Sequence, residues 1–145
     1  NTSVVNASIH LGLLSEDELP SYKDLTELPH YDETEGHEIG KIFYMGRDNE
    51  GNDIYLMGVG SAKPIVLNAL QSLMDIYDIC SHEVLFVNSL IGVHLLTRIG
   101  GFISRRLHFI SLGRPLTVLG IRRSFSRYVE LVRSVKQRVK EKDKG

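Results

Sequence analysis

Residues 40–60, GKIFYMGRDNEGNDIYLMGVG, decide the fold, because they hold two β-rich runs on either side of a turn. GKIFYMG and NDIYLMGVG carry the aromatic and β-branched side chains typical of strands. The joining segment, RDNEGN, contains the Asn and Gly residues that tight turns favour. This stretch therefore predicts a β-hairpin.

The segment GVGSAKP at 58–64 leads from this hairpin into an apolar run that starts at Ile65. From residue 63 to 79 apolar residues recur every three or four positions, which predicts a helix with one buried face, and Pro64 fits its first turn. The segment is not a Walker phosphate loop, because its glycines and Lys63 stand in the wrong register. Two interpretations remain: Ser61 caps the helix, or it helps the helix N-terminus to hold an anion.

Further elements are predicted on both sides of this centre. Residues 2–12 have helical spacing and end at Gly12, and a short helix is expected in the polar connection 15–38. Residues 83–89 and 114–120 are apolar runs typical of buried strands, and 90–107 has a mostly helical pattern. A final helix is predicted from an apolar face of Ile121, Phe125, Val129, Val132, Val135 and Val139.

This order of elements predicts an α/β fold: a mixed, mainly parallel Rossmann-like sheet with helices on both faces and one β-hairpin. With 145 residues and 42% hydrophobic content, we expect one domain over 1–145, with a charged tail at 140–145 that frays. There is no apolar run of about 18 residues and no secretory signal, so we expect a cytoplasmic protein without a membrane span. The one cysteine, Cys80, excludes an intrachain disulfide, and we expect it to be inert.

Charge is divided unevenly along the chain although the net charge is −1. Up to residue 97 there are four basic and fifteen acidic residues, and from Arg98 onward there are thirteen basic and three acidic residues. Such halves either neutralise each other within the fold or present separate faces to partners. A basic section alone is not a nucleic-acid signature, and we do not expect nucleic-acid binding.

Four segments, TSVVNASIHLGLL, PSYKDLTELPHYD, the hairpin pattern GxDxxGNxxYxxG and GGFISRRL…GRPLTVLGI, are similar to a small bacterial family of uncharacterised proteins, a domain of unknown function. The resemblance covers nearly the whole chain. It implies that a first strand and a turn containing Cys, Gly and His precede the Ser-Val-Val helix, so that the chain lacks its natural first strand. It implies no established activity.

Two helix starts are the main candidates for a ligand site. The first follows the turn that the resemblance implies, and the second is the strand-to-helix turn of the hairpin. Both would offer backbone amides and the positive end of a helix dipole, and in this fold they could converge at the carboxyl edge of the sheet. The candidate ligand-binding residues are Thr2, Ser3, Gly58, Gly60, Ser61 and Lys63.

Two other groups are weaker candidates. One is a set of arginines that either contact an anion or partner or pair with the acidic front half: Arg98, Arg105, Arg106 and Arg114. The other is the segment 30–38, where His30, Asp32 and His37 are weak metal candidates, and where a hydrolase could place acid and base groups. Its spacing matches no standard metal motif, so no metal is predicted.

The sequence thus supports two hypotheses about function. It does not tell whether the protein is an enzyme, and it indicates no particular cofactor. The first is an α/β protein that binds a phosphate-bearing or other anionic small molecule at helix N-termini. The alternative is a protein-protein interaction module that uses an acidic loop and a basic C-terminal helix, with a homo-oligomer as one outcome.

Overall fold

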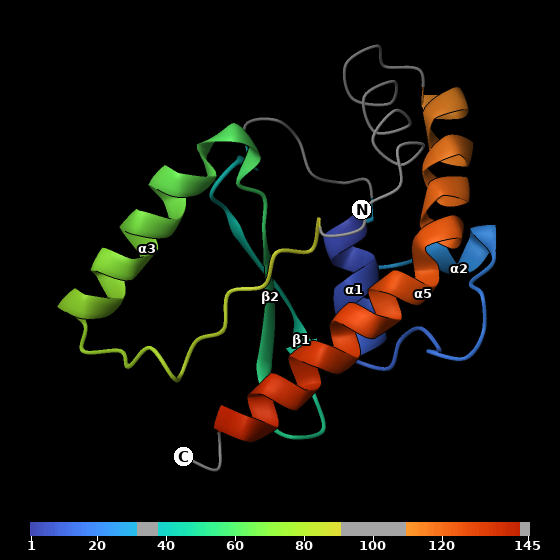
Figure 1. Ribbon diagram of the computed structural model, residues 1–145. Coiled ribbons are helices and arrows are strands. Elements are labelled where there is room, and N and C mark those ends of the chain that lie inside the picture. The colour runs from blue at the N-terminus through green and yellow to red at the C-terminus, as the bar shows by residue number, and fades with distance from the viewer. Residues whose placement is uncertain (32–37, 91–109, 143–145) are drawn as a thin grey trace.

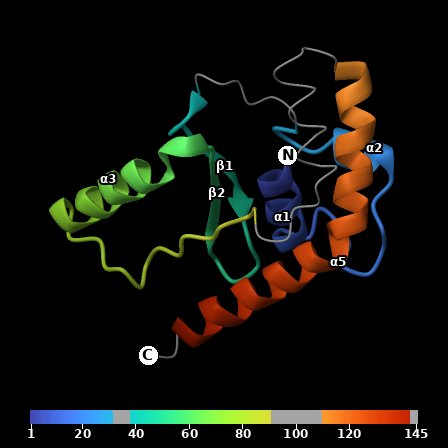
Figure 2. The ribbon, with the colours of Figure 1, turned by 45° about the horizontal axis from the view of Figure 1, so that its top comes forward.

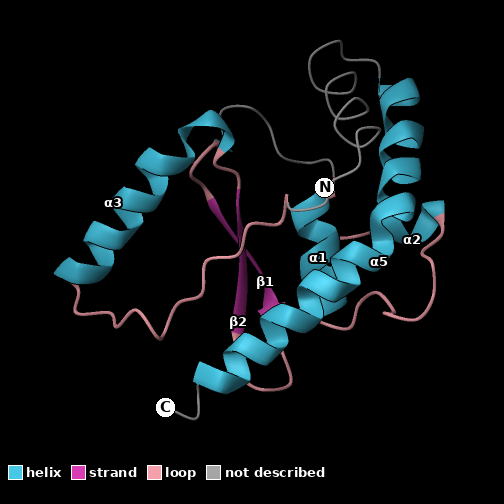
Figure 3. Ribbon diagram, viewed as in Figure 1, coloured by secondary structure: helices cyan, strands magenta, loops and turns pink. Residues whose placement is uncertain are grey.

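The computed structural model describes residues 1–31, 38–90 and 110–142, and in them several helices surround one β-hairpin (Figures 1 and 3). The predicted first helix, short second helix, hairpin, helix after the hairpin and C-terminal helix are all confirmed. The elements are α1 (Thr2–His10), α2 (Tyr22–Thr26), β1 (Ile42–Arg47), β2 (Asp53–Met57), the 3₁₀ turn η2 (Gly60–Ala62), α3 (Lys63–Ile76) and α5 (Ile110–Lys142).

The hydrophobic core lies where α1 and α2 pack against α5 (Figure 1). The side chains of Val5, Leu25 and Ile121, one from each helix, are completely buried. Burying an aliphatic side chain of this size stabilises the fold by about 1.5–3 kcal/mol. The core comprises Val4, Val5, Ile9, Leu14, Leu25, Leu28, Tyr31, Val118, Ile121, Phe125, Tyr128, Val129 and Val132.

Helix α5 contributes a stripe of buried residues and is otherwise strongly charged. Its core residues, from Val118 to Val132, are spaced by one, three or four positions, as on one face of a helix. Arg and Lys side chains cover much of the remaining surface. Although α5 is 33 residues long, none of the helices among the described residues is both long and apolar enough to cross a membrane.

The hairpin is antiparallel and packs one of its faces on the core. Tyr44 lies opposite Tyr55 on the outer face, whereas Met45 and Leu56 pack against the core. A bulge lies between Tyr44 and Gly46, and Gly46 has a φ of +143°, a conformation that side chains other than glycine rarely adopt. The bulge therefore explains the glycine within β1.

The predicted Rossmann-like α/β fold is wrong, because in the described part of the chain the sheet consists of β1 and β2 alone and is antiparallel. Neither predicted parallel strand forms. Residues 114–120 lie inside α5, and residues 83–89 have turn and irregular structure with Phe86 and Val87 exposed. A parallel strand needs cover on both faces, which an exposed segment lacks. Most of the predicted helix 90–107 lies outside the described residues.

Helix α3 lies apart from the core. Figures 1 and 2, which view the molecule from different directions, both show α3 on the far side of the hairpin from α5. It is joined to β2 through η2, and of its own side chains only Met74 is buried. The prediction that this helix has one buried face is therefore only partly met.

Candidate functional site

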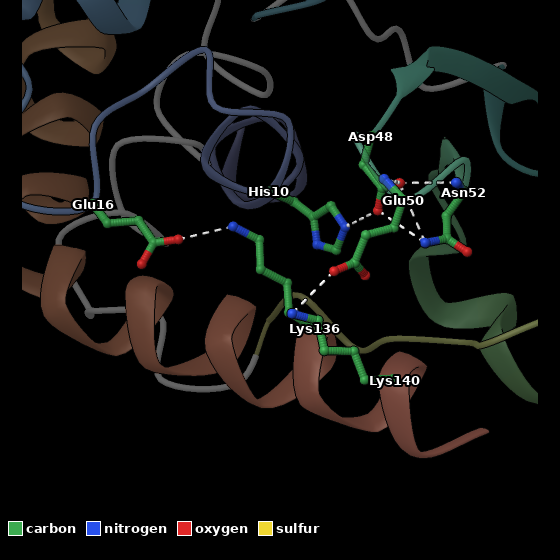
Figure 4. A network of polar contacts seen from close by, with 7 residues as sticks. All are labelled: His10, Glu16, Asp48, Glu50, Asn52, Lys136 and Lys140. Carbon is green, nitrogen blue, oxygen red and sulfur yellow. Dashed lines mark hydrogen bonds and ion pairs between the residues drawn. The ribbon is translucent and has the colours of Figure 1, made fainter. Parts of the chain in front are cut away.

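A partly buried histidine–aspartate pair connects α1 to the hairpin turn. His10 is the last residue of α1, and its Nε2 lies 3.0 Å from Oδ2 of Asp48. The two side chains are only 7% and 10% exposed. In Figure 4 the imidazole lies between Asp48 and the side chain of Lys136 on α5.

Asp48 also organises the turn between the two strands. Its carboxylate accepts hydrogen bonds from the backbone amides of Glu50 and Asn52, at 2.9 and 2.8 Å, and from the Asn52 side chain. Burial alone would raise the pKa of Asp48, but the hydrogen bonds from Asn52, His10 and Glu50 outweigh it and lower this pKa to about 2. The carboxylate is therefore ionised at neutral pH, and Nε2 of His10 carries the proton that it accepts.

Ion pairs attach α5 to both neighbouring segments (Figure 4). Glu16, in the loop after α1, accepts hydrogen bonds from Arg133 and Lys136 at 2.9 Å each, and these bonds lower the pKa of Glu16. Lys140 lies 3.0 Å from Glu50 in the hairpin turn. The basic helix thus pairs in part with the acidic front half of its own chain.

A surface hollow of about 330 Å³ opens beside this network. Its lining includes His10, Glu16, Asn49 and Lys136, together with the backbone at Gly12. A carboxylate that orients an imidazole is an arrangement also used in acid–base catalysis. The other contacts of Asp48 lie within its own turn, and the network as a whole fixes α1, the hairpin and α5 relative to one another.

The start of α3 exposes the residues predicted to bind an anion there. Gly58, Gly60, Ser61 and Lys63 are all exposed, and Gly60 has a φ of +49°, which favours glycine. The prediction that Ser61 caps the helix is wrong, because the N-cap is Ala62 and no side chain caps α3. In the described part of the chain, no side-chain hydrogen bond or ion pair of Ser61 or Lys63 is found.

The start of α1 is arranged differently. Thr2 is buried, and the hydroxyl of Ser3 lies 2.6 Å from the hydroxyl of Ser89, which attaches the segment after α3 to α1. Figures 1 and 2 agree that the start of α1 and the start of α3 lie apart. The two predicted groups of ligand-binding residues are therefore not brought together.

The weaker candidates fall largely outside the described residues. Arg98, Arg105, Arg106, Asp32 and His37 all lie there, and Arg114 belongs to α5, where its side chain is not described. His30 has a φ of +61°, and its ring centroid lies 5.4 Å from that of Phe43. The arginine site and the weaker metal and hydrolase hypotheses for these segments thus stay predictions.

The surface that sequence reasoning missed is the outer side of α3. Ile65, Ile76 and Tyr77 are 73%, 70% and 72% exposed, and Leu73 is also exposed. Helical periodicity identifies the apolar side of a helix but not what covers it. Likewise, D-x-x-G-N at 48–52 indicates a turn, but nothing in the sequence pairs Asp48 with His10.

Over residues 1–31, 38–90 and 110–142, these features define a mainly helical protein with a β-hairpin, a network of ion pairs that joins its elements, and a helix with an exposed apolar side. The chain belongs to the family described as protein of unknown function (DUF3189), whose model matches residues 1–137. This agrees with the resemblance to an uncharacterised family. Comparisons with curated proteins and with solved structures found no match.

Proposed function

We propose that this protein is an interaction module in which the apolar side of α3 docks against α3 of a second copy of the chain. The observation that carries the proposal is the exposed stripe on this helix, formed by Ile65, Ala69, Leu73, Ile76 and Tyr77. These positions are spaced by one, three or four residues and fall on one side of a helix. Such a stripe is typical of helices that pair with another helix.

The hydrophobic effect favours burial of this apolar stripe against another surface. A large aliphatic or aromatic side chain gains about 1.5–3 kcal/mol when it moves from water into a packed interface. Soluble monomers rarely expose contiguous apolar patches larger than a few hundred Å². Ile65 and Ile76 lie near opposite ends of α3, so an interface along the stripe would use most of the helix.

Charge complementarity favours a second copy as the occupant. Lys63 begins α3, whereas Asp75 and Asp78 lie at its other end, and all three are exposed. When two copies of α3 pack antiparallel, the end of the helix that begins with Lys63 lies beside the partner's end that carries Asp75 and Asp78. The helix dipoles then also oppose each other. A two-fold interface of this kind is self-complementary.

The predicted alternative surface, the acidic loop with the basic helix, has less support. Glu16 and Glu50 already bind Arg133, Lys136 and Lys140 within the chain. Most of the acidic loop lies outside the described residues, although Arg122 and Arg127 on α5 are exposed. The salt dependence of association distinguishes the two surfaces. Association between the acidic loop and the basic helix would weaken at high salt, whereas association through the apolar side of α3 would not.

Ile76→Asp is expected to convert a concentration-dependent dimer into a monomer, because it places a charge in the apolar seam. Sedimentation velocity over a range of protein concentrations measures this. Leu119→Asp is the matched control, since Leu119 is exposed on α5, on the far side of the hairpin from α3, and its variant should still form dimers. A wild-type protein that stays monomeric at every concentration would refute the proposal.

A charge exchange tests the antiparallel arrangement itself. Lys63→Asp should weaken the dimer, and adding Asp75→Lys in the same chain should restore it. Restoration is expected because the double variant again places opposite charges at the adjoining ends of the two helices. If the second substitution weakens the dimer further, the helices do not pair in this direction.

Binding of a phosphate-bearing or other anion at the start of α3 is a second candidate function. It is supported by the exposure of Ser61 and Lys63 beside uncapped amides in the first turn of the helix. We expect phosphate to raise the thermal midpoint, with about 2.7 kcal/mol of stabilisation at 100 times its dissociation constant. Lys63→Ala should abolish this shift.

Two controls keep the candidate functions distinct. Lys23→Ala removes another exposed lysine, on α2, and should leave the phosphate-induced shift unchanged. Ile76→Asp should break the dimer but keep the shift. If phosphate raises the midpoint of Lys63→Ala as much as that of the wild type, the start of α3 is not the binding site.

A further inference from the structure

We infer that Cys80, His82 and Glu83 form a binding site for a divalent transition-metal ion such as Zn²⁺. The three residues lie in the turn directly after α3, and all are exposed. One ligand atom from each, the Cys sulfur, an imidazole nitrogen and a carboxylate oxygen, lies within 4.8 Å of the other two. Rotation of these side chains would let all three atoms surround one Zn²⁺ ion, each at the metal–ligand distance of about 2.0–2.3 Å.

Two hydrogen bonds between Cys80 and Glu83 hold the turn at residues 80–83 in place. The amide of Glu83 donates to the carbonyl of Cys80 at 2.9 Å, and the amide of Cys80 donates to Oε1 of Glu83 at 3.0 Å. The second carboxylate oxygen of Glu83 is then available to a metal. Metal binding would therefore need changes in side-chain rotamers but no movement of the backbone.

The far end of α5 holds the same turn from outside. Nζ of Lys142 donates to the carbonyls of Ser81 and Val84, at 3.1 and 3.4 Å. Lys142 therefore acts as a positioning residue, since it contacts the backbone on both sides of His82 and Glu83. The turn is fixed between the end of α3 and the end of α5.

The ligand types indicate the class of metal. A thiolate and an imidazole favour Zn²⁺, Co²⁺ or Cu²⁺ over Mg²⁺ and Ca²⁺, which prefer oxygen ligands. Three protein ligands leave at least one coordination position for water or a small ligand. The spacing C-x-H-E matches no standard zinc motif, and the sequence led us to expect an inert Cys80.

Cobalt titration provides a direct test, because the chain has a single cysteine. Reduced protein without a histidine tag is titrated with Co²⁺, and the near-ultraviolet thiolate-to-cobalt charge-transfer band is followed. We expect the band to saturate at one Co²⁺ per chain, to disappear when Zn²⁺ is added, and to be absent in Cys80→Ser. Circular dichroism verifies that each variant folds.

Three variants then test the remaining ligands by Zn²⁺ competition with a chromophoric chelator. His82→Ala should weaken Zn²⁺ binding at least about tenfold, since even loss of an outer-shell partner costs that much. Glu83→Gln should also weaken it, although the amide oxygen can still accept from Cys80. Glu27→Gln, the matched control for the carboxylate, changes an exposed glutamate at the end of α2 and should bind like the wild type. A missing charge-transfer band, one metal per two chains, or unchanged affinity in both His82→Ala and Glu83→Gln would overturn the site.

Discussion

Ile121→Ala is expected to lower the free energy of unfolding by about 2–5 kcal/mol, the range for truncating a buried aliphatic side chain. Ile121 is completely buried in the core that α5 forms with α1 and α2. Alanine removes apolar contacts and leaves a cavity, because close-packed neighbours relax only in part. Urea unfolding followed by circular dichroism should show a lower midpoint with an unchanged slope.

Leu119→Ala is the matched control and also decides between two secondary structures. In the buried strand predicted at 114–120, Leu119 would be covered like a core residue, whereas on α5 it lies outside the buried stripe. Leu119 is 44% exposed, so its truncation should cost only about 0.5 kcal/mol. Equal losses from the two variants would favour the strand predicted at 114–120 and contradict the helix.

The second prediction concerns the dependence of stability on pH. The pKa of Asp48 is about 2 in the folded protein, against an ordinary value of 3.8. A lowered folded-state pKa contributes stability that is complete above about pH 5 and is lost as the pH falls toward 2. At about 1.4 kcal/mol per pKa unit, this contribution is up to about 2 kcal/mol.

Asp48→Asn should therefore remove part of the acid sensitivity of the wild type, because the asparagine does not titrate. The free energy of unfolding of each protein is measured at several pH values between about 2 and 7. The difference between wild type and variant is then followed as a function of pH. Asp17→Asn serves as control, since the Asp17 side chain is 90% exposed, and it should keep the pH slope of the wild type. Parallel curves for Asp48→Asn and the wild type would show that the hydrogen bonds to the Asp48 carboxylate do not lower its pKa.

Patterns over a few neighbouring residues correctly predicted the helices and the hairpin, whose hydrogen bonds join residues close in sequence. The spacing of Ile121, Phe125 and Val129 identified the buried side of the last helix, and the Asn-Gly chemistry at 49–52 identified the hairpin turn. The strand predicted at 114–120 was wrong because a short apolar run fits a strand and a buried helix equally well. Here Val118 continues the buried stripe of α5, and this tertiary contact decides the outcome.

The candidate sites depended still more on tertiary contacts. The exposure of Ser61 and Lys63 fits their prediction as surface residues of a turn, but their separation from Ser3 could not be known without the fold. His10 showed no partner in the sequence because Asp48 lies 38 residues away along the chain. Pairings at such separations leave no periodic signal.

The long-range attachment of α5 has a consequence for the growing polypeptide. Arg133 and Lys136 bind Glu16 across 117 and 120 residues, and Val5 and Leu25 share their core with residues 118–132. At about 5–20 residues per second, a ribosome needs roughly 5–20 s to add the hundred residues between them. During that interval the early helices lack their partner, so nascent chains are expected to depend on chaperones until α5 leaves the exit tunnel.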